Sequence, residues 1–269
     1  GLTKRRGDVA LQGLDLTLPA GCIMGLIGEN GAGKSTTIRL ILNALSRDGG
    51  TVAVYGKDNR ALTPLEREDI GAVLDEVGLP EYMTARQIGR MMAGIFARWQ
   101  PEVYRDYLRR LALPEDKTFR DFSRGMKMKL GLAAALSHQP KLLLLDEATS
   151  GLDPVVRDEI LTIFADFTRD EEHAVLISSH IVSDLEKICD YIAFLHKGRL
   201  LLCEEKDRLT EEYGILRGGT DGIAPAAVCG RHATPYGTEY LVRRDAVPVG
   251  MALGQVNIED LFVFMAKEA

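Results

Sequence analysis

Three short apolar runs along the chain, each closed by polar residues, predict strands that are buried on both faces. They cover residues 22–28, 141–147 and 174–180. A helical pattern follows each run, over residues 34–45, 154–169 and 181–189. Buried strands that alternate with helices are typical of an α/β fold with a mainly parallel sheet and helices on both faces. In such sheets the ligand binds at the carboxyl ends of the strands, so we expect the polar residues there to form the functional site.

The middle and the end of the chain depart from this alternation. Between about residues 78 and 138 the strand signal disappears, and helices are predicted over 84–98, 101–111 and 124–138. Residues 191–203 contain a Lys197-Gly198 turn and predict a hairpin, which would give the sheet an antiparallel edge. Past Gly214 the sequence is rich in glycine and proline, with a weak strand at 238–243. A final amphipathic helix follows, with Asn257 as its expected N-cap.

Composition and charge narrow the class of protein. Glycine supplies 27 of 269 residues, without a collagen period or a linker tract, so it must serve particular backbone positions. A net charge of −6 argues against a protein that coats nucleic acid. The four cysteines are scattered and indicate free thiols in a reducing compartment rather than a disulfide framework. No apolar stretch approaches the length of about 18 residues needed to cross a bilayer. We therefore expect a cytoplasmic location.

The segment Gly28-Glu29-Asn30-Gly31-Ala32-Gly33-Lys34-Ser35 matches the phosphate-binding P-loop pattern in full. A buried strand is predicted before it and a helix after it, which is the required context. The glycines let backbone N–H groups curl around phosphates, and the helix N-terminus adds partial positive charge. Lys34 is expected to reach the β- and γ-phosphates and Ser35 to bind Mg²⁺. Many P-loop NTPases share these features.

Asp146 and Glu147 end the second apolar run. Asp146 is expected to hold Mg²⁺ directly or through a water molecule, and Glu147 to take a proton from the attacking water. On their own, both residues would also fit as caps of the following helix. Beside a complete P-loop, the metal and catalytic roles are favoured.

Three further features narrow the choice: Phe122-Ser123-Arg124-Gly125-Met126 before a predicted helix, Ser150-Gly151-Leu152-Asp153 after Glu147, and Ser179-His180 at the end of the third strand. With them, the chain resembles the ATP-binding subunit of an ABC transporter, from the group that serves ABC-2 type exporters. The resemblance covers about residues 2–213. It implies a P-loop NTPase fold over 1–213 with a helical subdomain inserted at about 76–138. Residues 214–269 would form a small C-terminal extension of unknown role.

The resemblance also implies roles for individual residues. Ser123 and Gly125 would form the signature loop, which contacts the γ-phosphate of an ATP held by the opposite subunit. Asp153 would lie in the loop between the two sites, and His180 would contact the γ-phosphate as the switch histidine. Contacts to ATP within the chain are expected from Gly28, Asn30, Gly31, Ala32, Gly33, Lys34, Ser35 and Thr36.

The chain differs from the family pattern in three places. The third glycine and the final glutamine of the signature are Arg124 and Met126. The glutamine at the start of the helical insertion aligns with Asp75, which we hypothesise to bind Mg²⁺ in its place. The aromatic residue that stacks on adenine is absent from residues 4–11. The guanidinium plane of Arg6 would stack on adenine in place of the aromatic ring. Alternatively, the three cations Lys4, Arg5 and Arg6 lie in solvent.

The function implied by the resemblance is ATP hydrolysis that drives a separate transmembrane permease. Two ATP-binding subunits, as a homodimer or a heterodimer, would close head-to-tail over two ATP molecules on the inner face of the cell membrane. The alternative is a soluble ABC ATPase with a regulatory, ribosome- or DNA-associated role. Proteins of that kind usually contain two cassettes in one chain, long coiled-coil insertions or basic extensions, and none of these is found in this sequence. A P-loop kinase or GTPase would not account for Ser123–Gly125 or His180. In this family the membrane subunit selects the substrate.

Overall fold

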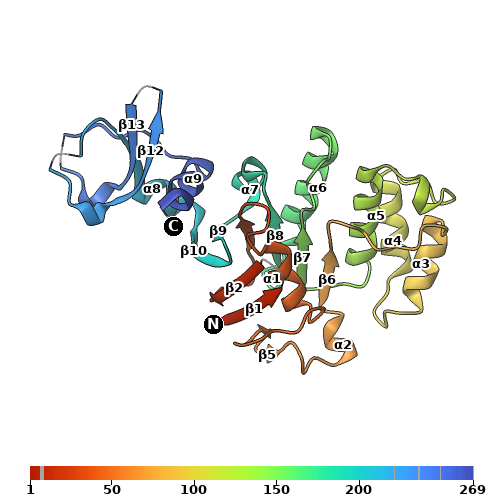
Figure 1. Cartoon of the computed structure of the whole chain (residues 1–269). Coiled ribbons are helices and arrows are strands. Elements are labelled where there is room, and N and C mark those ends of the chain that lie inside the picture. Colours follow the sequence, from red (N-terminus) through yellow and green to blue (C-terminus); the bar gives the residue numbers. More distant parts are fainter. Residues whose placement is uncertain (7–8, 221, 236, 249, 269) are drawn as a thin grey trace.

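The computed structural model describes residues 1–6, 9–220, 222–235, 237–248 and 250–268. Its centre is a six-stranded sheet in the order β10-β9-β3-β8-β7-β6 (Figure 1). The strands are β3 (Ile23–Ile27), β6 (Ile70–Val73), β7 (Leu142–Asp146), β8 (Ala174–Ser179), β9 (Tyr191–His196) and β10 (Arg199–Glu205). Neighbouring strands are parallel except β10, which pairs antiparallel with β9. The predicted mainly parallel sheet with an antiparallel edge is therefore confirmed.

Alternation along the buried strands builds one core on each face of the sheet. In β7, Leu143 and Leu145 join one apolar cluster, while Leu142 and Leu144 join the other. The same division runs through β3, where Ile23 and Ile27 lie on the first face. Helices α5 (Arg124–Leu136), α6 (Pro154–Phe167) and α7 (Val182–Ile188) cover that face. Helix α1 (Lys34–Ile41) and the strands β1 (Leu2–Arg6) and β2 (Val9–Leu14) cover the opposite one. Both faces are covered, which explains why these strands read as continuous apolar runs.

The helices follow the predicted order, although several end earlier than expected. They are α1 (Lys34–Ile41), α2 (Pro64–Arg67), α3 (Ala85–Ala93), α4 (Pro101–Arg110), α5 (Arg124–Leu136), α6 (Pro154–Phe167), α7 (Val182–Ile188), α8 (Lys206–Glu212) and α9 (Ile258–Glu268). Helix α1 ends before Asn43, which adopts the left-handed φ of 54°. Helix α3 ends at Ala93, with Gly94 as its C-cap, so residues 94–98 of the predicted helix lie outside the observed one.

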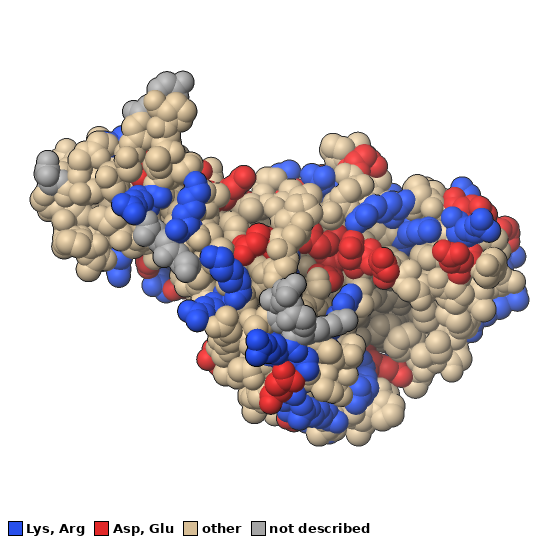
Figure 2. All heavy atoms as spheres, viewed as in Figure 1, with Lys and Arg blue, Asp and Glu red and all other residues tan. Residues whose placement is uncertain are grey.

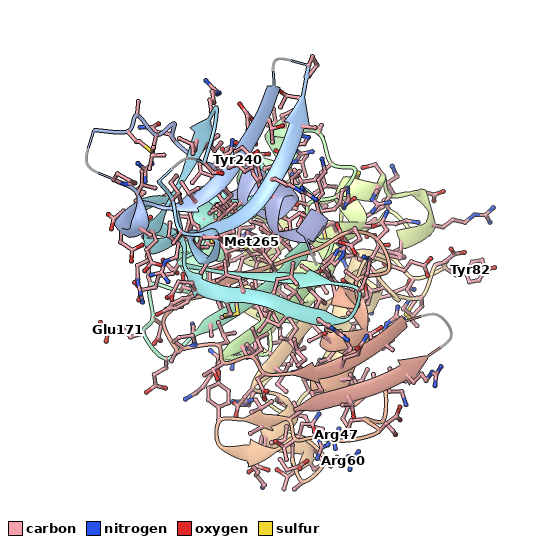
Figure 3. The ribbon with its side chains drawn as sticks, turned by 60° about the vertical axis from the view of Figure 1, so that its left-hand side comes forward. Arg47, Arg60, Tyr82, Glu171, Tyr240 and Met265 are labelled. Atoms are coloured by element: carbon pink, nitrogen blue, oxygen red, sulfur yellow. The ribbon has the colours of Figure 1, made fainter. Side chains whose placement is uncertain are left out.

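Helices α3, α4 and α5 lie between β6 and β7 in sequence and form the right-hand part of Figure 1. Thr84 and Gln87 cap α3 reciprocally, and Pro101 begins α4, so both helices start where their sequences favour a start. Tyr104 of α4 is buried, and its hydroxyl donates to the Ala85 carbonyl. Tyr82 points away from this part into solvent (Figure 3), with 81% of its surface exposed.

Two small antiparallel ribbons precede the helical part. They are β1 (Leu2–Arg6) with β2 (Val9–Leu14), and β4 (Ala53–Val54) with β5 (Lys57–Asp58). Arg47 ties the second ribbon by donating to Asp58 and Asn59 (Figure 3).

The C-terminal residues form a three-stranded sheet in the order β11-β13-β12, built from β11 (Tyr213–Arg217), β12 (Val228–Thr234) and β13 (Gly237–Arg243). Only β13 was predicted; β11 and β12 were missed. Short 3-10 helices occur at Phe119–Asp121, Pro225–Ala227 and Arg244–Ala246. Asn257 caps α9 as predicted, because its side chain accepts from the Asp260 N–H at 2.7 Å. None of the helices in the described residues is both long and apolar enough to cross a bilayer.

Candidate nucleotide site

The loop between β3 and α1 requires glycine at several positions. Gly31 and Gly33 have φ of 84° and 110°, in the left-handed region that side chains disfavour. Gly28 has no such φ, but a Cβ atom there would lie 2.3 Å from the Leu195 carbonyl oxygen of β9. The P-loop backbone therefore fits against the neighbouring strand only without a side chain.

Lys34 begins α1, and its buried ammonium lies under the loop. It donates to the Gly28 carbonyl at 2.7 Å and lies 3.3 Å from Glu147 Oε1. Gly33, the N-cap, has no side chain to occupy the first N–H groups of α1. Those N–H groups and the Lys34 charge together make the end of this helix an anion site.

Ser35 and Asp146 meet at the carboxyl ends of β3 and β7. The Ser35 hydroxyl donates to Asp146 Oδ1 at 3.0 Å, and the Ser178 hydroxyl donates to the same oxygen at 2.6 Å. Asp146 is buried. Two hydroxyl donors thus hold one carboxylate oxygen in place, which is how a buried carboxylate is satisfied.

Glu147 follows β7 with a left-handed φ of 52°, which is uncommon for a residue with a side chain. Its N–H donates to the carbonyl and to the hydroxyl of Ser178, both at 3.1 Å. The carboxylate lies between Lys34 and His180: Lys34 Nζ lies 3.3 Å from Oε1 and His180 Nδ1 lies 2.7 Å from Oε2. Since a carboxylate accepts, His180 Nδ1 is the donor. The backbone conformation aims the carboxylate into the cleft.

Glu29 of the P-loop and His196 of β9 form a contact that the sequence analysis did not identify. His196 Nδ1 lies 2.9 Å from Glu29 Oε1. Partial burial would raise the pKa of Glu29, but the close contact with His196 and backbone hydrogen bonds outweigh burial and lower it. Glu29 therefore adds a fixed negative charge at the rim of the cleft.

A cleft of about 490 Å³ opens above these groups. It is lined by Glu29, Asn30, Gly31, Gly33, Lys34, Ser35, Thr36, Asp75, Arg124, Glu147, Ser150 and His180. The structure thus brings Lys34, Ser35, Glu147, His180 and Asp75 together from four separate segments. Gly28 and Ala32 lie below the lining; Ala32 packs into the core, and its N–H donates to the Glu29 carbonyl at 3.1 Å.

Ser123, Gly125 and Asp153, at the starts of α5 and α6, also do not line this cleft. Ser123 caps α5 by accepting from the Met126 N–H at 3.3 Å. Asp153 caps α6 by accepting from the N–H groups of Val155 and Val156. Within one chain, these side chains act as helix caps. A contact with ATP from Ser123 and Gly125 would therefore have to be made across a subunit interface.

Arg124 joins three of the lining loops. Its Nη2 donates to Asp75 Oδ1 at 2.8 Å, and its Nε donates to the Ser150 carbonyl at 3.0 Å. The sequence placed Asp75 and Arg124 in two separate motifs, 49 residues apart, with no signal that they meet.

The residues at the strand ends fit a magnesium ion. Among the described residues no group of three or more His, Cys, Asp or Glu side chains is arranged to hold a metal. Mg²⁺ does not require such a group, because it binds through one or two carboxylates, keeps several waters and takes phosphate oxygens. The Ser35 and Asp146 oxygens, 3.0 Å apart, are ligands of the required hard type.

The sequence analysis missed Ser178, although its position at the end of the 174–180 run was a usable signal. The side chain of Arg6, considered as a partner for adenine, lies outside the described part of the structure.

Comparisons with known proteins agree with this geometry. The family described as ABC transporter matches over residues 11–150. The bacitracin transport ATP-binding protein BcrA of Enterococcus faecalis is 32% identical over 270 residues, covering 96% of this chain and 86% of that protein. The lantibiotic transport ATP-binding protein SrtF of Streptococcus pyogenes is 31% identical over 199 residues, covering 73% of this chain and 85% of that protein. A solved structure of an ATP-binding subunit of an ABC transporter superposes with a TM-score of 0.70 at 27% identity, covering 78% and 90% of the two chains.

Proposed function

Since the chain belongs to the ABC transporter family, as an ATP-binding subunit with ATPase activity, we propose that it powers an exporter of the ABC-2 type through a separate transmembrane permease. The names of BcrA and SrtF refer to transport of bacitracin and of a lantibiotic, which supports transport over a soluble regulatory, ribosome- or DNA-associated role. We place the ATPase unit at residues 1–213, with its helical subdomain at about 76–138. Residues 214–269 form the extension.

The observation that carries the proposal is the contact set around Glu147. Lys34 and His180 hold its carboxylate at 3.3 and 2.7 Å, above Ser35 and Asp146. In this proposal the P-loop N–H groups and Lys34 bind the phosphates of ATP. Ser35 and Asp146 would hold Mg²⁺, which would neutralise phosphate charge, and Asp75 would supply a further carboxylate oxygen to it.

Glu147 accepts the proton of the attacking water, because it is the one acidic group of the cleft that both Lys34 and His180 orient. His180 donates through Nδ1 to Glu147 and fixes the direction of its carboxylate. A proton on Nε2 would let the other side of the ring donate to the γ-phosphate. Ser123 and Gly125 contact the ATP of a second subunit, and Asp153 lies in the loop that communicates between the two ATP sites. The second subunit is a copy of this chain or a related ATP-binding chain, and the pair is peripheral on the inner face of the membrane.

The test is Glu147→Gln, which keeps the size of the side chain but cannot accept a proton. We expect phosphate release to fall by about 10²–10⁴-fold, with ATP still bound, so that ATP-bound dimers accumulate in size-exclusion chromatography. Lys34→Ala is the control, because this variant should lose the binding of ATP as well as its hydrolysis. A Glu147→Gln variant that hydrolyses ATP at the parental rate would contradict the assigned base.

Copurification separates transport from the alternative. We expect the chain, expressed in its own cell, to be recovered with an integral membrane protein after mild detergent extraction. Recovery with ribosomes or DNA instead would favour the soluble role.

A further inference from the structure

Asp75 and Arg124 place a charged pair at the mouth of the cleft, at two positions where the ABC pattern described above has glutamine and glycine. Arg124 reaches from the start of α5 to Asp75 after β6 at 2.8 Å and to the Ser150 carbonyl after β7 at 3.0 Å. Its guanidinium also lies against Gly151, where a Cβ atom would be 3.2 Å from Nε. Arg124 thus links the start of α5 to the segments that follow β6 and β7, and it offsets the charge of Asp75.

The pair contributes little to the stability of the fold. The two side chains are 53% and 52% exposed, so the surrounding water screens their attraction. The pair instead changes the charge of the cleft, because Asp75 and Arg124 line it together with Lys34 and Ser35. An unpaired Asp75 would turn a full negative charge toward the polyphosphate of a nucleotide. With Arg124 on it, that repulsion is offset without a metal ion.

We propose that Arg124 is a positioning residue that neutralises Asp75 and so allows the cleft to admit the phosphates of ATP, with Mg²⁺ as the competing cation for the same carboxylate. The proposal rests on the function assigned above. It predicts that Asp75 and Arg124 act as a unit in nucleotide binding, and that the importance of Arg124 falls when Mg²⁺ is present.

The experiment is a double-mutant cycle read by equilibrium binding of a fluorescent ATP analogue, in EDTA and again in excess Mg²⁺. In EDTA we expect Arg124→Gln to weaken binding about tenfold and Asp75→Asn not to weaken it. The double variant should return to within about threefold of the parent. In Mg²⁺ the loss caused by Arg124→Gln should shrink to about threefold or less.

Arg86→Gln is the matched control. Arg86 is also half exposed and pairs with Glu115 at 3.2 Å, but it lies in α3 and does not line the cleft. It should leave binding unchanged. Thermal unfolding of each variant shows whether it is folded.

Arg124→Lys keeps the charge and serves if the glutamine variant does not fold; it should bind within about threefold of the parent.

Three results would overturn the proposal. A double variant as weak as Arg124→Gln would mean that Arg124 acts on phosphate without Asp75. An Arg124→Gln variant equal to the Arg86→Gln control would mean that the pair does not affect binding. A lysine variant as weak as the glutamine variant would exclude a role through charge. If the parent chain itself failed to bind ATP, and Lys34→Ala made no difference, the assigned function would fail rather than this proposal.

Discussion

Gly28 lies in the P-loop and Gly125 in the first turn of α5, and their surroundings differ. A Cβ at Gly28 would lie 2.3 Å from a backbone oxygen of β9, whereas a Cβ at Gly125 would lie 3.4 Å from a flexible Val156 methyl. A Cβ at Gly28 would force the sheet to move, whereas a Cβ at Gly125 would make an ordinary packing contact. The fold therefore requires glycine at position 28 but tolerates a larger residue at position 125.

We expect Gly28→Ala to lower the free energy of unfolding by about 3 kcal/mol, measured by urea denaturation. Gly125→Ala should leave it unchanged or raise it slightly, since alanine favours the first turn of α5. If Gly125 approaches ATP across an interface as proposed, its alanine variant should still hydrolyse ATP at least about tenfold more slowly. An alanine at Gly125 that unfolds the chain would show that the glycine serves the fold instead.

Most individual site residues could be predicted from sequence because the P-loop and the strand ends define their positions along the chain. Lys34, Ser35, Asp146 and Glu147 met as expected. The contacts of Arg124 with Asp75 and of His196 with Glu29 could not be predicted. They depend on how loops from distant segments face each other across the cleft, which local patterns do not encode.

At the scale of elements, the end of α5 is held against the segment after α3 by a buried histidine. The His138 ring stacks on Phe96, with centroids 4.2 Å apart, and its Nδ1 donates to the Glu68 carbonyl. Burial lowers the pKa of His138 and outweighs the raising effect of the hydrogen bond to Glu68. Arg98 adds to the lowering. Folding therefore favours the neutral form of the ring.

This predicts a pH-dependent loss of stability. Below about pH 6.5 the unfolded chain binds a proton on His138 before the folded chain does. The contribution of His138 is thus complete above about pH 6.5 and is lost as the pH falls. The slope is at most about 1.4 kcal/mol per pH unit. Urea denaturation at several pH values should show a flatter profile for His138→Gln than for the parent. Parallel profiles would contradict a buried neutral His138.

Elements with a buried apolar run could be predicted from sequence, whereas elements that depend on their partners could not. Strand β12 contains Gly230, Arg231 and His232, so its local pattern is not that of a strand. It forms because it pairs with β13 and because α9 packs directly over Gly230, where a Cβ would lie 2.8 Å from the Phe264 carbonyl oxygen. Packing of this kind involves residues 34 positions apart.

At the scale of the whole molecule, the C-terminal extension shares a core with the ATPase part. Ile258, Leu261 and Phe264 of α9 belong to the cluster that contains Leu185 and Phe194. Met265, marked in Figure 3, packs against the same cluster. The Ile258 N–H also donates to Glu186 of α7 at 3.0 Å. Figure 2 shows basic and acidic side chains interspersed on one face of this combined body.

We expect Leu261→Ala, at a fully buried site, to lower the free energy of unfolding by about 2–5 kcal/mol. Because the core is shared, the whole chain should still unfold in one transition, followed by circular dichroism and by ATP-site fluorescence. Leu65→Ala is the control, since Leu65 is 57% exposed and should change stability by no more than about 0.5 kcal/mol. Two separate transitions would show that the extension is an independent unit.

The strand order has a consequence for synthesis of the protein on the ribosome. Strand β3, which leads into the P-loop, is made early, but it pairs with β8 and β9 on its two sides. The ribosome must add about 150 residues after β3 before β8 is complete. At about 5–20 residues per second, this takes roughly 8–30 s. During that time the apolar strand that precedes the P-loop lacks both neighbours, so the nascent chain depends on delayed collapse or on chaperones until residue 196 has left the exit tunnel.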